Sequence, residues 1–395
     1  MALNMHEPPR LLFAGVDTLY AAVQGTLPLE TLERLAVARD IAKGRRDNEP
    51  EIIELGPDRT AFRLDAAGQR GGYHYRLSLP DPLSPVIAVR HNPIAAEWNG
   101  FISIGSLSLL GLGHNAAFAK AMELLAVMEF RWLGYSLNRV DYAMDFLAPG
   151  FEVDPARFVA PNRTTGRPHL GKTRHDSEEG DAVPGWHFQP ILKGRRYESA
   201  TLGKLPRLQT IVYDKRREAI DQRKAHWFDV WGIDRADADA RVWRIEVRAG
   251  GEHLKYKWQV RQIEDVDRRL PSIVAKGLHT FRCIAPEEND TNVSRRPLDP
   301  LWAAATEHAK TVMLRNGPAL DPDALRAIDR KQVEATLSAQ IVGCGAALAH
   351  LRGVGDLDED EAPFVDLLCD VAQHALGDAK KPVQGAMKRA AKRYG

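Results

Sequence analysis

Residues 137–147, with the sequence LNRVDYAMDFL, alternate between two kinds of side chain along their whole length. A period of two is typical of a β-strand whose two faces have different neighbours. One face is mostly apolar, whereas the other carries Arg139, Asp141, Ala143 and Asp145. Because aspartate is depleted in strands, two of them in one strand require an explanation. The pattern predicts a strand that buries its apolar face and presents both carboxylates to water.

A second stretch, residues 242–248 (VWRIEVR), divides its side chains in the same way. Its polar positions are Arg244, Glu246 and Arg248, and the positions between them are apolar. Two strands with the same division favour a single sheet with one charged face. We therefore expect the acidic side chains of both stretches to face a common hollow.

These carboxylates have two alternative interpretations. Asp141 and Asp145 are four residues apart, which places their backbones about 13 Å apart on a strand that rises about 3.3 Å per residue. One of them could hold a divalent cation together with Glu246, and hard oxygen ligands favour Mg²⁺ or Mn²⁺. Alternatively, the acids form a structural network of ion pairs with the arginines of the two stretches. The spacing alone does not decide between the two.

The composition is that of an ordinary globular protein. The chain has 395 residues, a hydrophobic content of 44%, a charged content of 27% and a formal net charge of +1. Any nucleic-acid-binding surface must therefore be local. Cys283, Cys344 and Cys369 are far apart, which argues against a disulfide framework or a cysteine zinc site. No secretory leader begins the chain and no apolar run reaches the roughly 18 residues of a membrane helix. We expect a cytoplasmic protein without a membrane partner.

The hydrophobic patterns predict an α+β fold with an antiparallel-rich central sheet, helices packed on one face, and a helical C-terminal module. Further strands are predicted at residues 11–23, 51–64, 72–79, 85–89, 101–110, 186–192 and 208–214. Helices are predicted at residues 27–45, 114–134, 216–227, 257–269, 271–278, 300–314 and 325–351.

These elements suggest four parts of the chain. They are a loose tail (1–10), a sheet-centred core (11–255) with a mobile loop at 149–184, a helical extension (256–317) and a helical C-terminal module (318–395). The last part carries an apolar stripe that is more typical of a core than of an interface: Leu337, Ile341, Cys344, Leu348 and Leu351. This module, with its basic tail at 380–393, could pair protomers in a homodimer.

Two further motifs each have a functional and a plain interpretation. Tyr213–Asp214–Lys215 ends a strand and enters a helix, so Asp214 is a good N-cap, or Lys215 and Tyr213 lie beside a phosphate bound at the helix start. Basic residues surround Tyr197 in a predicted hairpin, as a nucleic-acid strand requires, although such a run is more often a solvated turn. These basic residues are Arg195, Arg196, Lys204 and Arg207.

The order of the motifs is more informative than any one of them. Along the chain come Arg139-x-Asp141-x-x-x-Asp145, a glycine-bearing turn at 201–204 (TLGK), Tyr213–Asp214–Lys215 with Glu218 behind it, and Arg244-x-Glu246-x-Arg248. Together they resemble the Rep-trans superfamily, which contains rolling-circle replication initiators and MobT-type relaxases. Residues 289–302 (NDTNVSRRPLDPLW) also look like a segment that follows the nuclease core in that superfamily. The resemblance covers roughly residues 11–302.

The resemblance implies a sheet-centred nuclease core that binds an origin of replication or transfer on a plasmid, phage or integrative element. It also implies a divalent metal and a tyrosine that attacks a DNA phosphodiester, which leaves a 5′-phosphotyrosine. By position, the metal-holding acids would be Asp141, Asp145 and Glu246. The residues that steady the acids or the phosphate would be Arg139, Lys215, Arg244 and Arg248, of which Lys215 and Arg244 are catalytic candidates and Arg139 and Arg248 are DNA-binding candidates.

The chain departs from the superfamily at the nucleophile. The usual tyrosine position, before the Tyr213–Asp214–Lys215 motif, is occupied here by Thr201 or Ala200. Tyr197 lies three to four residues upstream and is the candidate nucleophile, with Tyr213 as the other choice. Two functions stay open: an enzyme that nicks and rejoins DNA, or a catalytically inactive relative that binds origin DNA or regulates the element. A structural sheet protein with an ion-pair network is a third possibility.

Overall fold

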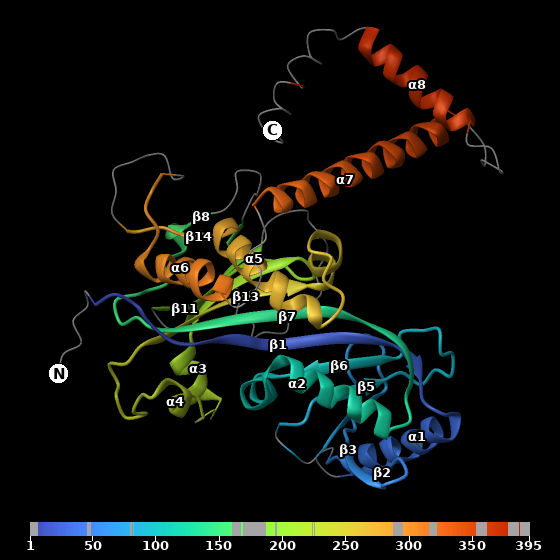
Figure 1. Cartoon of the computed structure of the whole chain (residues 1–395), viewed down its shortest axis with the longest axis vertical. Coiled ribbons are helices and arrows are strands. Elements are labelled where there is room, and N and C mark those ends of the chain that lie inside the picture. Colours follow the sequence, from blue (N-terminus) through green and yellow to red (C-terminus); the bar gives the residue numbers. More distant parts are fainter. Residues whose placement is uncertain are drawn as a thin grey trace. The chain divides into compact units, whose positions relative to one another are not determined.

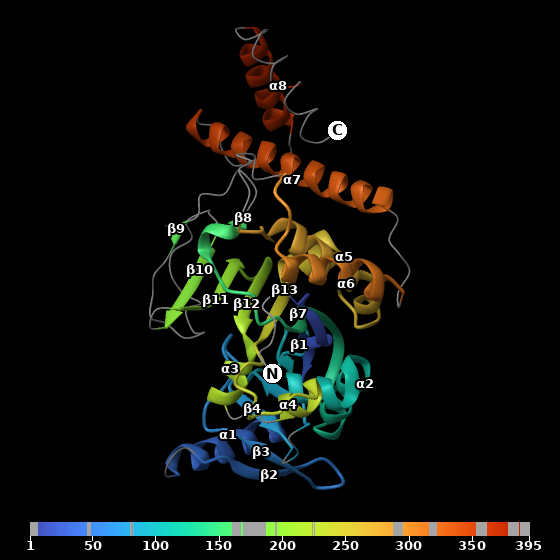
Figure 2. The ribbon, with the colours of Figure 1, turned by 90° about the vertical axis from the view of Figure 1, so that its left-hand side faces the viewer.

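The computed structural model describes residues 7–45, 49–79, 81, 83–159, 167–168, 187–193, 196–222, 224, 226–286, 295–315, 322–352, 362–377 and 387. It divides into two compact units, Met1–Ala319 and Leu320–Gly395. The first unit contains a large sheet and six α-helices among its described residues, and the second contains two helices (Figures 1 and 2). The predicted α+β class, with an antiparallel sheet and a helical C-terminal part, is confirmed.

Twelve strands of the described residues form one sheet in the order β2-β3-β4-β5-β6-β1-β7-β13-β12-β11-β10-β9. Neighbouring strands pair antiparallel except β9 and β10, which are parallel. The strands are β1 (Arg10–Thr26), β2 (Glu51–Leu55), β3 (Thr60–Leu64), β4 (Tyr75–Ser78), β5 (Val86–Val89), β6 (Gly100–Ile104), β7 (Arg131–Leu147), β9 (Arg167–Pro168), β10 (His187–Lys193), β11 (Arg196–Gly203), β12 (Leu208–Asp214) and β13 (Val242–Gly250). A small separate sheet pairs β8 (Phe158–Val159) with β14 (Arg282–Cys283).

The two central strands, β1 and β7, are each 17 residues long and pair along their whole length. β1 also pairs with β6, and β7 also pairs with β13, so this pair joins the two halves of the sheet. Their register shifts at four places, which are β-bulges or irregularities. A bulge inserts an unpaired residue and redirects nearby side chains.

Helices lie on both faces of the sheet, so the prediction of helices on one face is wrong in this detail. They are α1 (Leu29–Gly44), α2 (Ser106–Val127), α3 (Lys215–Asp221), α4 (His226–Trp231), α5 (Glu264–Thr280) and α6 (Pro300–Arg315), with short turns η2 (Pro155–Arg157) and η3 (His253–Lys257). Trp231 of α4 bonds Asp145, whereas Gly277 of α5 approaches Val247, which faces the other way on β13. Figure 1 accordingly shows α3 and α4 on one side of β1 and β7, and α5 and α6 on the other.

Several element boundaries differ from the sequence-based prediction. Residues 101–110 were predicted as one strand, but β6 ends at Ile104 and α2 begins at Ser106. The helix predicted at 114–134 ends at Val127, and Gly134 lies inside β7 because the polar–apolar alternation already begins there. The residues around Tyr197 form a strand of their own, β11. Most of the loop predicted at 149–184 lies outside the described residues, although 155–159 form η2 and β8.

The second unit contains α7 (Pro322–Leu351) and α8 (Ala362–Gly377). The two helices pack at Gly345, whose missing side chain leaves room for Phe364 and Leu368 of α8. The apolar stripe predicted to be core is largely exposed: Leu337, Ile341, Cys344 and Leu351 are exposed, and Leu348 is half-buried. The homodimer stays a prediction. Among the described helices, none is long and apolar enough to span a membrane.

Candidate functional site

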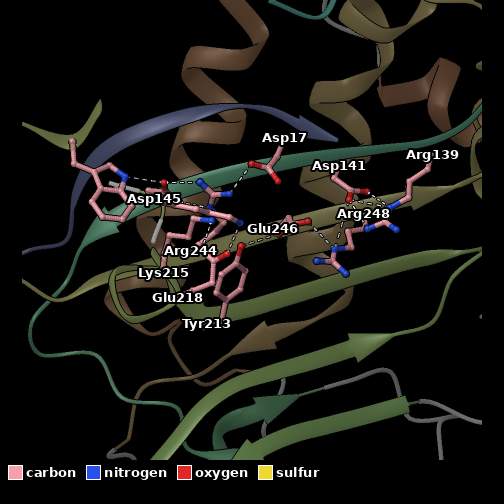
Figure 3. A network of polar contacts seen from close by, with 12 residues as sticks. Asp17, Arg139, Asp141, Asp145, Tyr213, Lys215, Glu218, Arg244, Glu246 and Arg248 are labelled. Atoms are coloured by element: carbon pink, nitrogen blue, oxygen red, sulfur yellow. Dashed lines mark hydrogen bonds and ion pairs between the residues drawn. The ribbon is translucent and has the colours of Figure 1, made fainter. Parts of the chain in front are cut away.

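The two alternating stretches form adjacent antiparallel strands, as predicted for one charged sheet face. Across β7 and β13, Arg244 lies opposite Asp145 and Arg248 lies opposite Asp141. Glu246 lies between the two arginines, on the same face (Figure 3). Its neighbour on β7 is Ala143, whose small side chain leaves space beside the carboxylate. The register of the sheet thus brings acids and guanidinium groups into two adjoining clusters.

The first cluster is built around Arg244. Asp145 Oδ1 accepts a hydrogen bond from Arg244 Nε at 2.5 Å, and Oδ2 accepts from Arg244 Nη2 at 2.8 Å and from Trp231 Nε1 at 2.9 Å. Both charged side chains are completely buried. Arg244 Nη1 donates to Asp17 Oδ1 at 2.7 Å. Every hydrogen-bonding oxygen of Asp145 therefore already has a partner.

Asp17 was not found by sequence analysis. It is the extra residue of β1 between Val16 and Thr18, which pair with Tyr142 and Asp141 of β7. This bulge places its carboxylate on the charged face, 14% exposed, beside Arg244. The signal available in the sequence was a single aspartate inside an otherwise apolar predicted strand, residues 11–23.

The second cluster is built around Asp141 and Glu246. Arg139 Nε donates to both oxygens of Asp141 at 2.9 Å, and its Nη2 donates to Oδ2 at 2.6 Å. Arg248 Nε donates to Glu246 Oε1 at 2.7 Å and lies 3.7 Å from Asp141 Oδ2. Such fork-shaped pairs with carboxylates are the strong, geometrically specific form of ion pair. We refer to the residues of both clusters as the charge network: Asp17, Arg139, Asp141, Asp145, Arg244, Glu246 and Arg248.

In the charge network, three of the acids are buried and two of the arginines reach solvent. The side chains of Asp141 and Asp145 are 0% exposed and that of Glu246 is 3% exposed, so the prediction that both aspartates face water is wrong. Arg139 and Arg248 retain 18% and 16% exposure. Buried carboxylates are stable only when they are paired and hydrogen-bonded, which the arginines provide. The surface therefore presents guanidinium groups, with the acids beneath them.

Lys215 belongs to an adjoining ion pair rather than to the charge network. Its Nζ lies 2.6 Å from Glu218 Oε2 and 4.8 Å from the ring centre of Trp227, and the side chain is only 3% exposed. Asp214 Oδ1 accepts from the backbone amide of Arg217 at 3.0 Å, so Asp214 is the N-cap of α3. The plain interpretation of this motif is thus confirmed.

The structure brings Tyr213, not Tyr197, to the acids. Tyr213 Oη donates to Glu246 Oε2 at 3.3 Å. Tyr197 lies on β11 two residues beyond Ser199, the residue opposite Tyr213, on the side away from Glu246. The position that aligns with Glu246 across β12 is Thr201, and four residues separate it from Tyr197, or about 13 Å at about 3.3 Å per residue. Tyr197 as nucleophile stays a prediction without a contact to the charge network among the described residues.

The turn of the predicted basic hairpin lies beside the Arg248 end of the charge network, because Gln209, just after the turn, lies opposite Arg248 and accepts a hydrogen bond from it. Lys204 and Arg207 are exposed in the turn between β11 and β12, and Arg207 Nε lies 3.4 Å from Glu252. Arg195 lies outside the described residues. Arg196 belongs to β11, but its side chain is outside the described part.

The three predicted metal ligands do not form a coordination shell. Asp145 is held by Arg244 and Trp231, whereas Asp141 and Glu246 are held by other arginines. Among the described residues, no three His, Cys, Asp or Glu side chains are placed to hold a metal ion. The residues as arranged do not fit Mg²⁺ or Mn²⁺, and the divalent cofactor stays a prediction.

The two neighbouring carboxylates Asp141 and Glu246 have very different pKa values. Burial raises the pKa of Asp141 to about 7, against the opposing effect of Arg139. Burial also acts on Glu246, but Arg248 and Arg244 outweigh it and lower the pKa of Glu246 to about 2. Burial raises the pKa of Asp17, although Arg244 opposes the shift. With a pKa of about 7, Asp141 changes its charge near neutral pH.

The contribution of Asp141 to stability should fall as pH rises from about 4 to about 7, whereas His253, whose pKa is lowered to about 3 by burial, contributes in the opposite direction. In that window the folded Asp141 keeps a proton that the unfolded residue, with an ordinary pKa of about 3.9, has lost. An Asp141→Asn variant should lack the Asp141 contribution, so the slope of its stability against pH should be less negative, or more positive, over the same window. Urea unfolding of both proteins at several pH values measures the two slopes, and equal slopes would show that Asp141 does not titrate there.

Comparisons with known proteins find distant structural similarity. No family model and no curated protein sequence match the chain. A solved structure titled a rolling circle replication initiator protein, from Geobacillus stearothermophilus, is similar over 75% of this chain and 96% of its own, with a TM-score of 0.39 and 15% identity. We therefore base the proposed function on the contacts of this chain itself.

Proposed function

We propose that this protein binds DNA at an origin of replication or transfer and acts as the initiator or mobilisation protein of a mobile element. The observation that supports this proposal is the layering of the charge network. The motifs that are ordered as in the Rep-trans superfamily meet on one face, where Arg139 and Arg248 lie between buried acids and solvent. A pair of guanidinium groups fixed by carboxylates is suited to bidentate contact with phosphate.

The protonation state of Asp141 changes the net charge around Arg139 and Arg248. With Asp141 ionised, its charge offsets those of Arg139 and Arg248, both of which it contacts. With its pKa raised to about 7 by burial, a large share of molecules carries neutral Asp141 near neutral pH. Neutral Asp141 leaves more positive charge for a phosphate, and phosphate charge supplies most of the affinity in protein–DNA binding.

Binding to duplex DNA from a random-sequence library tests the proposal. Arg139→Gln and Arg248→Gln should each weaken binding about 5- to 10-fold and lower the slope of log affinity against log salt by about one. Lys120→Gln, at a half-exposed position of α2 on another part of the surface, is the matched control and should bind as the wild type does. Thermal melting checks that the variants are folded.

Two outcomes would contradict the DNA-binding proposal. One is a wild-type protein with no salt-dependent affinity for DNA. The other is a pair of folded arginine variants that bind DNA as the wild type does. Either outcome would favour the third interpretation, in which the charge network serves stability alone.

Strand nicking is the second candidate function, favoured by one contact. Tyr213 Oη donates to Glu246, so a phenol and a carboxylate meet at the centre of the charge network. Burial raises the pKa of Tyr213 well above its ordinary value, which opposes the phenolate needed for attack. Each acid of the charge network is already bound to an arginine, which favours DNA binding over strand nicking as the function.

A supercoiled plasmid that carries the selected binding sequence separates the two functions. With Mn²⁺ or Mg²⁺, a nicking enzyme should give a nicked circle with covalently attached protein, which denaturing gels detect. Tyr213→Phe and Tyr197→Phe should show which tyrosine forms the adduct. If wild-type protein binds the plasmid and gives no adduct, the inactive, origin-binding relative is the correct interpretation.

A further inference from the structure

A strip of three aromatic rings, with a guanidinium group at each end, lies on the N-terminal half of the sheet. The ring centres of Tyr20 and Phe101 are 5.4 Å apart, and those of Phe101 and Tyr73 are 5.3 Å apart. Arg139 lies 5.4 Å from the ring centre of Tyr20 at one end, and Arg90 lies 4.9 Å from that of Tyr73 at the other. We call these five residues the aromatic strip.

The aromatic strip lies on the sheet face that α2 leaves uncovered. Along β1, Tyr20 alternates with Leu19, Ala21 and Val23, which are all completely buried. α2 packs on that buried side, where Phe118 contacts Tyr135, the partner of Val23. The rings of Tyr20 and Phe101, by contrast, are only half-buried, whereas the third ring, that of Tyr73, is 8% exposed.

Small residues surround the rings of the strip. Ala22 and Ala88 lie opposite Phe101 on the two neighbouring strands, and Ser103 lies opposite Tyr20. Ser136, opposite Ala22, is 5% exposed, and its Oγ has no hydrogen-bond partner among the described residues. A buried hydroxyl without a partner carries a cost that a polar ligand could remove.

One residue joins the aromatic strip to the charge network. Arg139 stacks against Tyr20 and also holds Asp141 through three hydrogen bonds. The contacts therefore run from the charge network through Arg139 on β7 to Tyr20 on β1 and then to Phe101 on β6. Because Arg139 contacts Tyr20 and Asp141 at the same time, its side chain is held in one position between the aromatic strip and the charge network.

We propose that the aromatic strip binds single-stranded DNA that leads away from the charge network. Aromatic side chains stack on bases regardless of sequence, and arginines contact the phosphates between them. A DNA duplex keeps its base faces covered, so it cannot use these rings. The sequence-based prediction already placed DNA at Arg139 and Arg248, together with basic residues such as Lys204 and Arg207 of the turn between β11 and β12, but it did not include the aromatic rings.

This inference rests on the proposed DNA-binding function, and its test measures single-stranded and duplex binding in parallel. The single-stranded probe is a fluorescent oligothymidylate of about 12 nucleotides, within the usual site sizes. Tyr20→Leu and Phe101→Leu remove a ring with little change in volume. Each should weaken single-strand binding about 5- to 100-fold and leave duplex binding within about twofold.

Two controls separate stacking from other effects. Tyr20→Phe keeps the ring and should bind the oligothymidylate as the wild type does. Trp132→Leu removes an aromatic side chain that is 50% exposed and lies outside the aromatic strip, opposite Gly25 of β1, and it should also leave binding unchanged. Thermal melting confirms that each variant is folded.

A second measurement uses the wild-type protein alone, in case the leucine variants fail to fold. An oligonucleotide with 5-iodouracil, irradiated in the complex, should crosslink to Tyr20 or Phe101, as identified by mass spectrometry. Crosslinks confined to the turn near Lys204 would overturn the strip. So would folded leucine variants that bind single strands normally, or a wild type that binds duplex but no single strand. A wild type that binds neither form of DNA would contradict the proposed function itself.

Discussion

Replacing Arg244 with leucine should lower the free energy of unfolding by about 3–5 kcal/mol, the usual effect of breaking a buried ion pair from one side. The variant leaves Asp145 completely buried with only Trp231 as a hydrogen-bond donor, and it also removes the partner of Asp17. Urea denaturation, followed by circular dichroism, measures the loss.

The double variant Arg244→Leu/Asp145→Asn should recover part of this loss because the unpaired buried charge is gone. Arg207→Leu is the matched control: it breaks an ion pair whose partners are 82% and 51% exposed. Such a pair contributes about 0–1 kcal/mol. If Arg244→Leu costs no more than Arg207→Leu, the charge network does not hold the sheet together as described.

Replacing Trp227 with alanine should cost a comparable amount, about 3–5 kcal/mol, as for other large aromatic residues in a core. Trp227 is completely buried among Phe13, Trp231 and neighbouring apolar side chains. Arg244 lies 4.3 Å from its ring centre and Lys215 lies 4.8 Å from it. The indole ring therefore makes cation–π contacts with two buried cations, Arg244 and Lys215.

Trp227→Phe tests this role separately from cavity formation. The indole Nε1 has no hydrogen-bond partner among the described residues, so phenylalanine loses no such bond and keeps an aromatic face toward both cations. We expect it to cost clearly less than alanine. Trp132→Ala, at an exposed position, should stay within about 0.5 kcal/mol of the wild type. Equal losses for Trp227→Phe and Trp227→Ala would contradict the proposed contacts with the cations.

The alternation in two short stretches predicted the centre of the fold correctly. Side chains two residues apart share a sheet face, so the polar positions of β7 and β13 had to lie together once the strands paired. Their burial was not predictable in this way. Alternation shows that two faces differ, but it does not show that α4, from another part of the chain, covers the Asp145–Arg244 end of the polar face with Trp227 and Trp231.

Asp17 and the aromatic strip escaped sequence analysis for a related reason. The bulge that redirects Asp17 is a property of the pairing between β1 and β7, and neither strand shows it alone. Likewise, Tyr20, Phe101 and Tyr73 lie in three segments separated by dozens of residues, and only the strand order brings them together. The contact between Tyr213 and Glu246 was also not predictable from the sequence, because it depends on the register between β12 and β13.

The position of β13 in the chain has a consequence for biosynthesis. β7 ends at Leu147, whereas its second partner is made only when residues 242–250 emerge from the ribosome. Until then, a nascent chain carries a 17-residue strand with one open edge, and Asp145 lacks the cation that will neutralise it. Open edges of this length recruit other strands, so the half-made protein is the form most exposed to aggregation and most dependent on chaperones.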